Sequence, residues 1–317
     1  MRIVVLGAGA VGSLFGARLA RAGHSVLLVG RADHVARIRS SGLIVRDHGE
    51  EIYRVEARVA LPPGAAADAA FLAVKTFDLE RAATALARAH PTPVPTLLAQ
   101  NGLGVEALAH PALAAGGWAE PERWTVRAVH SVPATWIGPG VVREAGSGEV
   151  LFPEPGPPRD GADPARTWRA LLEEAGFAVR VVPQFEREVW RKALVNAAIN
   201  PVTALRGVPN GALLEGAAHT EALTLLAEAR VAAGAAGFRF SEAEAVRDFE
   251  RIARATASNR SSMLQDLDRG RPTEIDAISG EILRVAGSHG IDLPATRAAH
   301  DAIRRRATQS RGTTQPS

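Results

Sequence analysis

Two lysines stand out in a chain that takes nearly all of its positive charge from arginine. Lysine and arginine total 37 residues, and only Lys75 and Lys192 are lysines. Lys192 is followed by Asn196 and Asn200 at steps of four, which places the three side chains along one stripe of a helix. An ammonium group can give up its proton where a guanidinium does not, and partial burial makes it a better general acid. We therefore expect Lys192 to protonate an oxygen during a reaction.

The same stripe could hold a small molecule that is rich in oxygen atoms. Pro201 follows Asn200 directly, and a proline inside a helix removes one backbone hydrogen bond and kinks the helix. One cationic donor and two amides can bind carbonyl and hydroxyl oxygens. A single lysine on a helix is more often a solvated surface residue, but the matched asparagines favour a binding or catalytic role for Lys192.

A glycine-rich turn near the N-terminus has the spacing of a dinucleotide-binding site. Gly7, Gly9 and Gly12 form G-x-G-x-x-G after an apolar strand and before an amphipathic helix. The first glycine permits a tight turn, the second lets the backbone approach a pyrophosphate, and the third lets helix and strand pack closely. The alternative is a turn that only needs glycines. The residues expected to bind the cofactor here are Gly7, Ala8, Gly9, Ala10, Val11 and Gly12.

The end of the second expected strand indicates which dinucleotide binds. An NAD site usually has an acid there for the ribose 2′-hydroxyl, but this chain has Arg31, which suits a 2′-phosphate. Asp33 lies two residues later and weakens the distinction. A solvated loop arginine is the alternative for Arg31. The sequence favours NADP(H) over NAD(H).

Strands and helices alternate through the first half of the chain. Apolar runs at 2–9, 25–31, 69–75 and 92–102 read as strands, and amphipathic segments at 11–23, 32–42 and 77–89 read as helices. Later runs at 126–132, 141–146, 148–152 and 178–183 also read as strands. The fold class expected is α/β, with an N-terminal Rossmann-like doubly wound parallel sheet followed by an all-helical C-terminal domain.

After Pro183 the spacing of apolar residues is that of helices. Segments 184–200, 221–237, 242–259 and 274–290 all read as helices, and Ser241 with Glu244 forms a plausible capping box for the third. We expect an NADP-binding domain over 1–183, a helical substrate and catalytic domain over 184–305, and a disordered basic tail over 306–317. The alanine-rich helices offer a face for a homodimer, which the sequence leaves undecided.

Composition excludes several classes of site. The chain has no cysteine, so disulfides, thiolate zinc sites and cysteine nucleophiles are excluded. The formal net charge is only +3, and four arginines without an acid lie in the segment from Arg304 to the end. We therefore expect no nucleic-acid binding. The nine histidines show no metal-ligand spacing. No apolar run is long enough to span a membrane, so we expect a soluble cytoplasmic protein.

Six motifs together make the chain resemble the ketopantoate reductase family, the 2-dehydropantoate 2-reductases, over nearly its whole length. They are "GAGAVGSLFG" from Gly7, "AVKT" around Lys75, "AQNGLG" around Asn101, "WRKALVNAAINPVTAL" around Lys192, "PNG" at Asn210 and "SNRSSMLQDLDRGRPTEIDAISG" from Ser258. The two long motifs, around Lys192 and from Ser258, are highly specific together, because the spacings between Asn259, Ser262 and Glu274 also match the family.

This resemblance implies NADPH-dependent reduction of 2-dehydropantoate to (R)-pantoate, a step that feeds pantothenate and coenzyme A synthesis. It makes Lys192 the proton donor. The residues it implies for binding the 2-keto acid are Asn101, Asn196, Asn200, Asn210, Asn259 and Ser262, with Ser262 on the carboxylate. It also places Asn101 between nicotinamide and substrate, Glu274 where the site closes near the cofactor, and Lys75 near the adenosine phosphate.

The residues themselves leave some alternatives open. A serine near a helix start, such as Ser262, is often a cap, and Glu274 could be a first-turn acid. Asn101 followed by glycine is a turn signal whatever the function. The reductase could act on another 2-keto acid, and a β-hydroxyacid or glycerol-3-phosphate dehydrogenase would share the glycine turn. A regulator that senses NADP(H) without turnover is a further alternative.

Overall fold

The computed structural model describes residues 1–47, 49–156 and 163–312, with only the helical backbone described for 310–312. The chain divides into two compact units. The first is Met1–Gln100 with Val105–Phe185, and the second is Asn101–Gly104 with the chain from Glu186 onward. The short segment at 101–104 therefore belongs to the second unit although it lies between a strand and a helix of the first.

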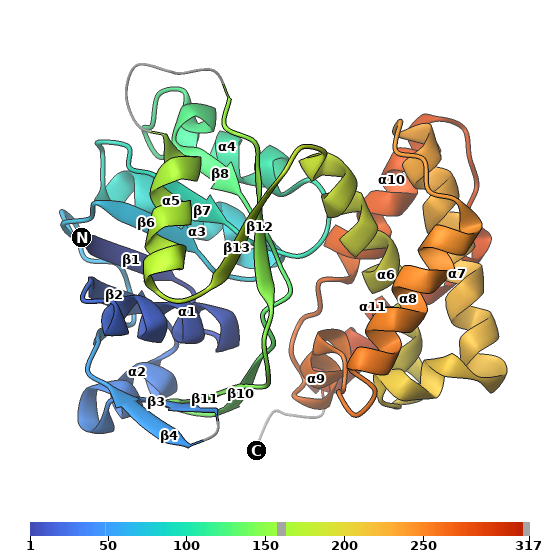
Figure 1. Cartoon of the computed structure of the whole chain (residues 1–317), viewed down its shortest axis with the longest axis horizontal. Helices are drawn as coiled ribbons and strands as arrows, with labels where there is room; N and C mark the ends of the chain where they lie inside the picture. Colours follow the sequence, from blue (N-terminus) through green and yellow to red (C-terminus); the bar gives the residue numbers. More distant parts are fainter. Residues whose placement is uncertain (48, 157–162, 313–317) are drawn as a thin grey trace. The chain divides into compact units, whose positions relative to one another are not determined.

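A six-stranded parallel sheet organises the first unit (Figure 1). Its order is β5-β2-β1-β6-β7-β8, and every neighbouring pair is parallel. The strands are β1 (Arg2–Leu6), β2 (Ser25–Val29), β5 (Glu56–Arg58), β6 (Ala69–Leu72), β7 (Thr96–Leu98) and β8 (Thr125–Arg127). The helices are α1 (Ala10–Arg21), α2 (Ala32–Ser41), α3 (Leu79–Ala89), α4 (Val105–Ala115) and α5 (Pro164–Glu174).

Successive residues of β1 show that helices cover both faces of this sheet. Ile3 and Val5 belong to a buried cluster with side chains of α1 and α5, whereas Val4 and Leu6 belong to a second cluster with side chains of α3 and α4. A strand that is buried on both faces is apolar at every position, which accounts for its continuous apolar run. The predicted doubly wound α/β sheet is confirmed.

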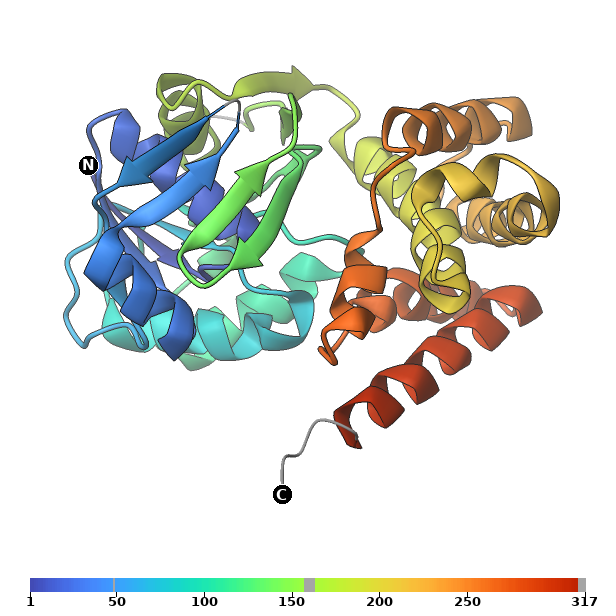
Figure 2. The same ribbon diagram turned by 90° about the horizontal axis from the view of Figure 1, so that it is seen from below.

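Two small sheets complete the first unit. One has the order β10-β11-β3-β4 and the other β13-β12-β9. Their strands are β3 (Leu43–Arg46), β4 (Glu50–Tyr53), β9 (Val129–His130), β10 (Ala134–Gly138), β11 (Val141–Glu144), β12 (Glu149–Pro153) and β13 (Ala178–Val182). Figure 2 shows the blue pair β3 and β4 beside the green pair β10 and β11, which join through β3 and β11. The sequence did not predict β3, β4, β5 or β10.

The second unit is helical among its described residues, as predicted. Its long helices are α6 (Phe185–Arg206), α7 (Gly216–Ala235), α8 (Glu242–Ala255), α10 (Glu281–Ser288) and α11 (Pro294–Gly312), and its short ones are η3 (Asn210–Leu214), α9 (Ser262–Asp268) and η4 (Asp276–Gly280), which is a π-helix. Ser241 caps α8, because its Oγ accepts a hydrogen bond from Glu244 N–H at 3.1 Å. The Glu244 carboxylate binds two arginines of α6.

The basic tail differs from the sequence-based expectation. We predicted disorder over 306–317, but α11 continues through Gly312. The guanidinium of Arg306 explains the difference, because it donates to the carbonyls of Ala204 at 3.0 Å and Leu205 at 2.8 Å at the end of α6. Cationic side chains satisfy open carbonyls at a helix C-terminus. The remainder of the predicted tail, 313–317, lies outside the described residues.

A buried histidine ties α1 and α2 to the β10–β11 hairpin. His34 lies in α2 with no exposed surface. Its Nδ1 accepts a hydrogen bond from Gly140 N–H at 2.8 Å, and its Nε2 lies 3.0 Å from Ser13 Oγ. Because Nδ1 accepts, a neutral ring carries its proton on Nε2 and donates to Ser13. Burial lowers the pKa of His34 and keeps the ring neutral.

His34 should make the fold less stable in mild acid. The unfolded chain protonates this histidine below about pH 6.5, whereas the folded chain resists protonation to lower pH. The unfolded state then binds more protons, so the free energy of unfolding falls as pH falls. We expect the decrease in Tm between neutral and mildly acidic pH to be smaller in His34→Gln than in the natural protein. Equal decreases in a calorimetric comparison would contradict this role.

Two kinds of feature are absent from the described ranges, a membrane-spanning helix and a cluster of metal ligands. No helix in them combines the length and apolar character that a membrane crossing requires. No group of three or more histidine, cysteine, aspartate or glutamate side chains in the same ranges could hold a metal ion.

Candidate functional site

Two of the three motif glycines are required by backbone packing in the first unit. Gly7 has a φ of +112°, and a Cβ added there would lie 2.6 Å from the carbonyl carbon of Ala73. A Cβ on Gly12 would lie 2.9 Å from the Ala73 Cβ. The turn is fixed by Val29, whose carbonyl accepts from Gly7 N–H and Ala8 N–H at 2.9 Å each. These two glycines therefore bring β1, α1 and the end of β6 close together.

Gly9 has a different role, because apart from its own chain neighbours no atom of the described residues lies within 4 Å of the position that its Cβ would occupy. It is the N-cap residue of α1 and has an ordinary extended conformation. No side chain caps this helix end, and its first turn has no acid. The first N–H groups of a helix have no intrahelical acceptor and carry a partial positive charge. This end of α1 therefore fits an anionic group such as the pyrophosphate of a dinucleotide.

Arg31 and Asp33 follow β2 at the carboxyl end of the sheet, as predicted. Arg31 is the N-cap residue of α2, and its side chain is exposed. Its guanidinium carbon lies 5.4 Å from the ring centre of Trp136 in β10. Asp33 lies in the first turn of α2, where an acid is favourable at a helix N-terminus. The position of Asp33 is therefore explained by its favourable charge at the start of α2. Arg31 is then the charged residue at the end of β2 that could bind a 2′-phosphate.

Lys75 lies just after β6, at the carboxyl edge where ligands of such sheets bind. It is half-buried and is the N-cap residue of the short helix η1 (Thr76–Asp78). Gln100, which the sequence did not single out, supports this segment. Its Nε2 donates to the carbonyls of Leu72 and, at 3.2 Å, of Val74. No spacing signal in the sequence pointed to Gln100, since its contacts lie far along the chain.

The second unit carries the lysine and asparagine stripe on α6. Lys192 and Asn196 are half-buried, and Asn200 is 7% exposed. α6 does not end at Pro201, because it continues to Arg206. Beyond the proline, the Thr203 hydroxyl donates to the Ile199 carbonyl at 2.8 Å. The three polar side chains therefore lie on one continuous helix that has a proline within it.

Asn210 and Asn259 meet through the backbone. Asn210 N–H donates to the Asn259 carbonyl at 2.9 Å, and the Asn210 side chain donates to Thr256 Oγ1 at the same distance. Asn210 is buried, and its Oδ1 has no hydrogen-bond donor among the described residues. Asn259 is exposed. Asn210 thus holds the turn at 256–259 in place, which the sequence did not reveal.

Ser261, rather than Ser262, caps α9. Its Oγ accepts from Leu264 N–H at 3.1 Å and lies 2.7 Å from the Thr203 hydroxyl of α6. Ser262 is the first residue of α9 and is exposed. The alternative that the serine here is a helix cap is therefore true of Ser261 and not of Ser262. Ser262 presents a hydroxyl at a helix N-terminus, an arrangement that can bind a carboxylate.

Asn101 and Glu274 come together although they are far apart in the sequence. Asn101 Nδ2 donates to a Glu274 carboxylate oxygen at 3.3 Å, and Glu274 is 5% exposed. The loop is held because Leu103 N–H donates to the Ala277 carbonyl at 2.9 Å. Gly102 has a φ of +92°, and a Cβ there would lie 2.7 Å from the carbonyl carbon of Ala277. The π-helix η4 begins at Asp276, two residues after Glu274, and such helices are frequent at functional sites.

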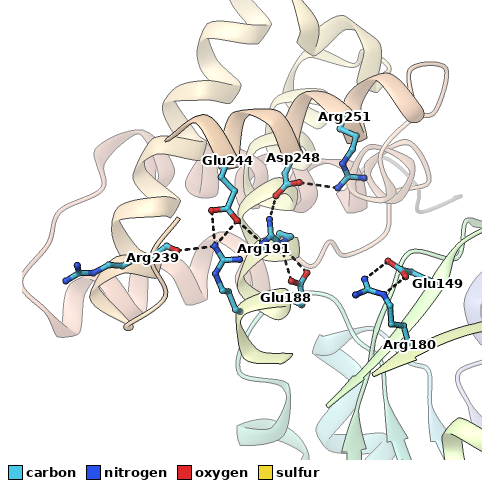
Figure 3. Close-up of polar contacts among 9 residues, drawn as sticks. Glu149, Arg180, Glu188, Arg191, Arg239, Glu244, Asp248 and Arg251 are labelled. Atoms are coloured by element: carbon cyan, nitrogen blue, oxygen red, sulfur yellow. Dashed lines mark hydrogen bonds and ion pairs between the residues drawn. The ribbon is translucent and has the colours of Figure 1, made fainter. Parts of the chain in front are cut away.

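An ion-pair network fixes the first turns of α6 against α8 (Figure 3). Arg191 pairs with Glu188 at 3.1 Å, with Glu244 at 2.8 Å and with Asp248, and Arg187 pairs with Glu244 at 2.7 Å. Burial lowers the pKa of Arg191, but its hydrogen bonds to Asp248 and Glu244, together with the charges of Glu188 and Asp248, raise that pKa overall. Arg191, the residue before Lys192, is therefore held firmly. Most ion pairs of this network join α6 to residues of α8, which are distant in sequence.

Comparisons with known proteins cover both units. The family model described as "Ketopantoate reductase PanE/ApbA" matches residues 3–156, and "Ketopantoate reductase PanE/ApbA C terminal" matches residues 184–307. The chain is 36% identical to the 2-dehydropantoate 2-reductase of Halobacterium salinarum, with 96% of this chain and 98% of that protein covered. It is 32% identical to the 2-dehydropantoate 2-reductase of Vibrio cholerae, with 96% and 97% covered.

Solved structures give the same picture of the fold. A PanE/ApbA family ketopantoate reductase from Ralstonia eutropha JMP134 has a TM-score of 0.86 and 29% identity, with 98% of this chain and 99% of that chain covered. A D-mandelate dehydrogenase in a ternary structure with NADH and anilino(oxo)acetate has a TM-score of 0.88 and 25% identity over the same shares.

Proposed function

Because the chain belongs to the ketopantoate reductase family, we propose that it is an oxidoreductase that reduces 2-dehydropantoate to (R)-pantoate with NADPH. The observation that carries the proposal is the stripe of Lys192, Asn196 and Asn200 on one continuous helix, in a chain with only two lysines. The similarity to 2-dehydropantoate 2-reductases over nearly the full length supports the same substrate. A homodimer through the helical unit, a cytoplasmic location and the limits 1–183 and 184–305 stay predictions.

NADPH is the cofactor that the first unit fits best. The open space at Gly9 and the uncapped end of α1 suit a pyrophosphate. Arg31 at the end of β2 suits a 2′-phosphate, because a guanidinium binds phosphate oxygens with two parallel hydrogen bonds. Lys75 would bind near the adenosine phosphate. The D-mandelate dehydrogenase neighbour has NADH in its structures, so the phosphate preference is a property to measure for this chain.

The chemistry needs one hydride and one proton to turn a ketone into an alcohol. The reduced nicotinamide, when bound, supplies the hydride to the ketone carbon. Lys192 gives its proton to the oxygen as negative charge develops there. Asn196 and Asn200 orient the keto acid, and such positioning contributes a large part of the rate.

The remaining candidates have supporting roles in this proposal. Ser262, exposed at the start of α9, would bind the substrate carboxylate. Asn210 N–H binds the carbonyl of Asn259, which lies in the turn just before Ser262. Asn210 therefore contributes at least by holding that turn in place. Glu274 fixes Asn101 through their hydrogen bond, which would orient Asn101 between nicotinamide and substrate.

A panel of 2-keto acids tests the proposal. We expect the purified chain to oxidise NADPH fastest with 2-dehydropantoate and to form (R)-pantoate, as shown by chiral chromatography. The panel includes phenylglyoxylate, because the neighbour named D-mandelate dehydrogenase makes an aromatic 2-hydroxy acid the second candidate product. Faster turnover of phenylglyoxylate would replace the proposed substrate. Tight NADPH binding without reduction of any acid would indicate a regulator.

A further inference from the structure

We propose that Trp136 is a positioning residue that sets the preference for NADPH over NADH by holding the guanidinium of Arg31, an inference that rests on the proposed NADPH-dependent function. Trp136 lies in β10, in the small sheet of order β10-β11-β3-β4, and is far along the chain from the glycine turn. Neither its type nor its position gave a sequence signal for the cofactor site. Its side chain would touch no atom of the cofactor and would act through Arg31.

The contact between the two side chains is the first observation. The Arg31 guanidinium carbon lies 5.4 Å from the centre of the Trp136 ring, within the range in which a cation is attracted to an aromatic face. Among the residues that the structure describes, no carboxylate forms an ion pair with Arg31. The ring therefore restrains the guanidinium without neutralising its charge. An exposed arginine held this way keeps its hydrogen-bond donors for a phosphate.

The ring itself is held from two sides. Trp136 is half-buried and pairs with Val142 across the β10–β11 hairpin, and the strand register shifts just after it. The hairpin turn is fixed at Gly140, whose N–H donates to His34 Nδ1 at 2.8 Å. The rings of His34 and Trp136 also approach, with centres 6.3 Å apart.

His34 connects the two partners because it lies in α2, of which Arg31 is the N-cap residue. The buried His34 side chain thus links the helix whose N-cap residue is Arg31 to the hairpin that carries Trp136. Its other nitrogen faces Ser13 in the first turns of α1, next to the glycine turn. The contact between Arg31 and Trp136 is therefore built into the cofactor-binding unit and does not depend on two loose surface side chains.

The consequence differs between the two cofactors. A 2′-phosphate gains two charge-assisted hydrogen bonds from a guanidinium that is already restrained, because less side-chain entropy is lost on binding. A 2′-hydroxyl carries no charge and gains little from Arg31. Removal of the ring should therefore weaken NADPH binding selectively and leave NADH binding unchanged.

A double-mutant cycle on the full chain tests this inference. Dissociation constants for NADPH and NADH are measured by calorimetry for the natural protein, Arg31→Ala, Trp136→Leu and the double variant. We expect Trp136→Leu to weaken NADPH binding by roughly two- to fivefold, the worth of an exposed cation–aromatic contact, with NADH unaffected. We expect no further loss when Trp136→Leu is added to Arg31→Ala. Trp136→Phe should recover part of the preference, because it keeps an aromatic face.

Trp124→Leu is the matched control, because Trp124 is also half-buried in the first unit but packs with the cluster of α3 and α4. It should leave the ratio of the two constants unchanged. Equal weakening of NADPH and NADH by Trp136→Leu, or an additive loss in the double variant, would overturn the role of Trp136. An Arg31→Ala variant with an unchanged ratio would instead overturn the NADPH preference itself, and this inference with it.

Discussion

Replacement of Lys192 by alanine should lower kcat by roughly 10²–10⁴-fold, the usual contribution of a positioned general acid. The half-buried ammonium on α6 would no longer protonate the oxygen that becomes negative as the hydride arrives. The dissociation constant for NADPH should stay unchanged, because the glycine turn and Arg31 belong to the other unit. Single-turnover oxidation of NADPH with saturating keto acid measures the chemical step directly.

The second lysine of the chain provides the matched control. Lys75→Ala should weaken NADPH binding while kcat at saturating cofactor stays nearly normal. Lys192→Ala should instead lower kcat and leave NADPH binding unchanged. Lys192→Arg keeps the charge but cannot release its proton, and it should remain as slow as Lys192→Ala. Near-normal turnover in either Lys192 variant, with Tm unchanged, would remove this residue from the proton-donor role.

The ion pairs around Arg191 help to explain how one lysine could be held ready for this step. Arg191 contacts three carboxylates, two of which lie on α8. The neighbouring Arg187 shares Glu244 and also lies 4.4 Å from the Phe240 ring centre. Because a buried ion pair often adds little net stability, we interpret this network as one that fixes the geometry of α6. The start of α6 is therefore fixed before a substrate binds, which reduces the cost of orienting Lys192.

The central strands of the large sheet, β1, β6 and β7, were predictable because they are buried on both faces, whereas its edge strand β5 was missed. Continuous apolar runs such as 3–6 and 69–72 have that origin. The small strands β3, β4 and β10 were missed because their burial alternates or is slight. Ile52 of β4, for example, is 60% exposed, and Glu50 and Glu51 beside it are exposed as well. Short strands of this kind depend on their partners more than on their own sequence.

The candidate site was predictable only where its residues are local in sequence. The stripe on α6 and the glycine turn follow from spacing within one element. The contact of Asn101 with Glu274, the support of Lys75 by Gln100 and the pairing of Arg31 with Trp136 join distant segments. No periodicity encodes such contacts. The assignment of the cap to Ser261 rather than Ser262 likewise needed the exact start of α9, which pattern reasoning does not locate to one residue.

Replacement of Gly9 by aspartate should abolish tight binding of both NADPH and NADH, with a loss of roughly 10²-fold or more, while the fold remains intact. Open space surrounds the added Cβ, and the backbone there is extended, so no strain is introduced. Aspartate is a favoured N-cap residue and would take the first-turn N–H groups of α1 for itself. Its charge would also repel the pyrophosphate. Loss of hydrogen bonds to a charged group of this kind is worth ~1.5–3 kcal/mol each.

Within the same motif, we expect Gly9 to be required for binding of the cofactor and Gly7 to be required for packing of the fold. We expect Gly9→Asp to keep or raise Tm, since it adds a helix cap, and Gly9→Ser to do the same with a smaller loss of affinity. Gly7→Ala should instead lower Tm, because its Cβ would meet the Ala73 backbone at 2.6 Å and a φ of +112° is strained for alanine. Thermal denaturation and cofactor titration of the three variants test both statements. Natural affinity in Gly9→Asp would show that the N-terminus of α1 binds no pyrophosphate, and a marked fall in its Tm would show that the open space serves packing.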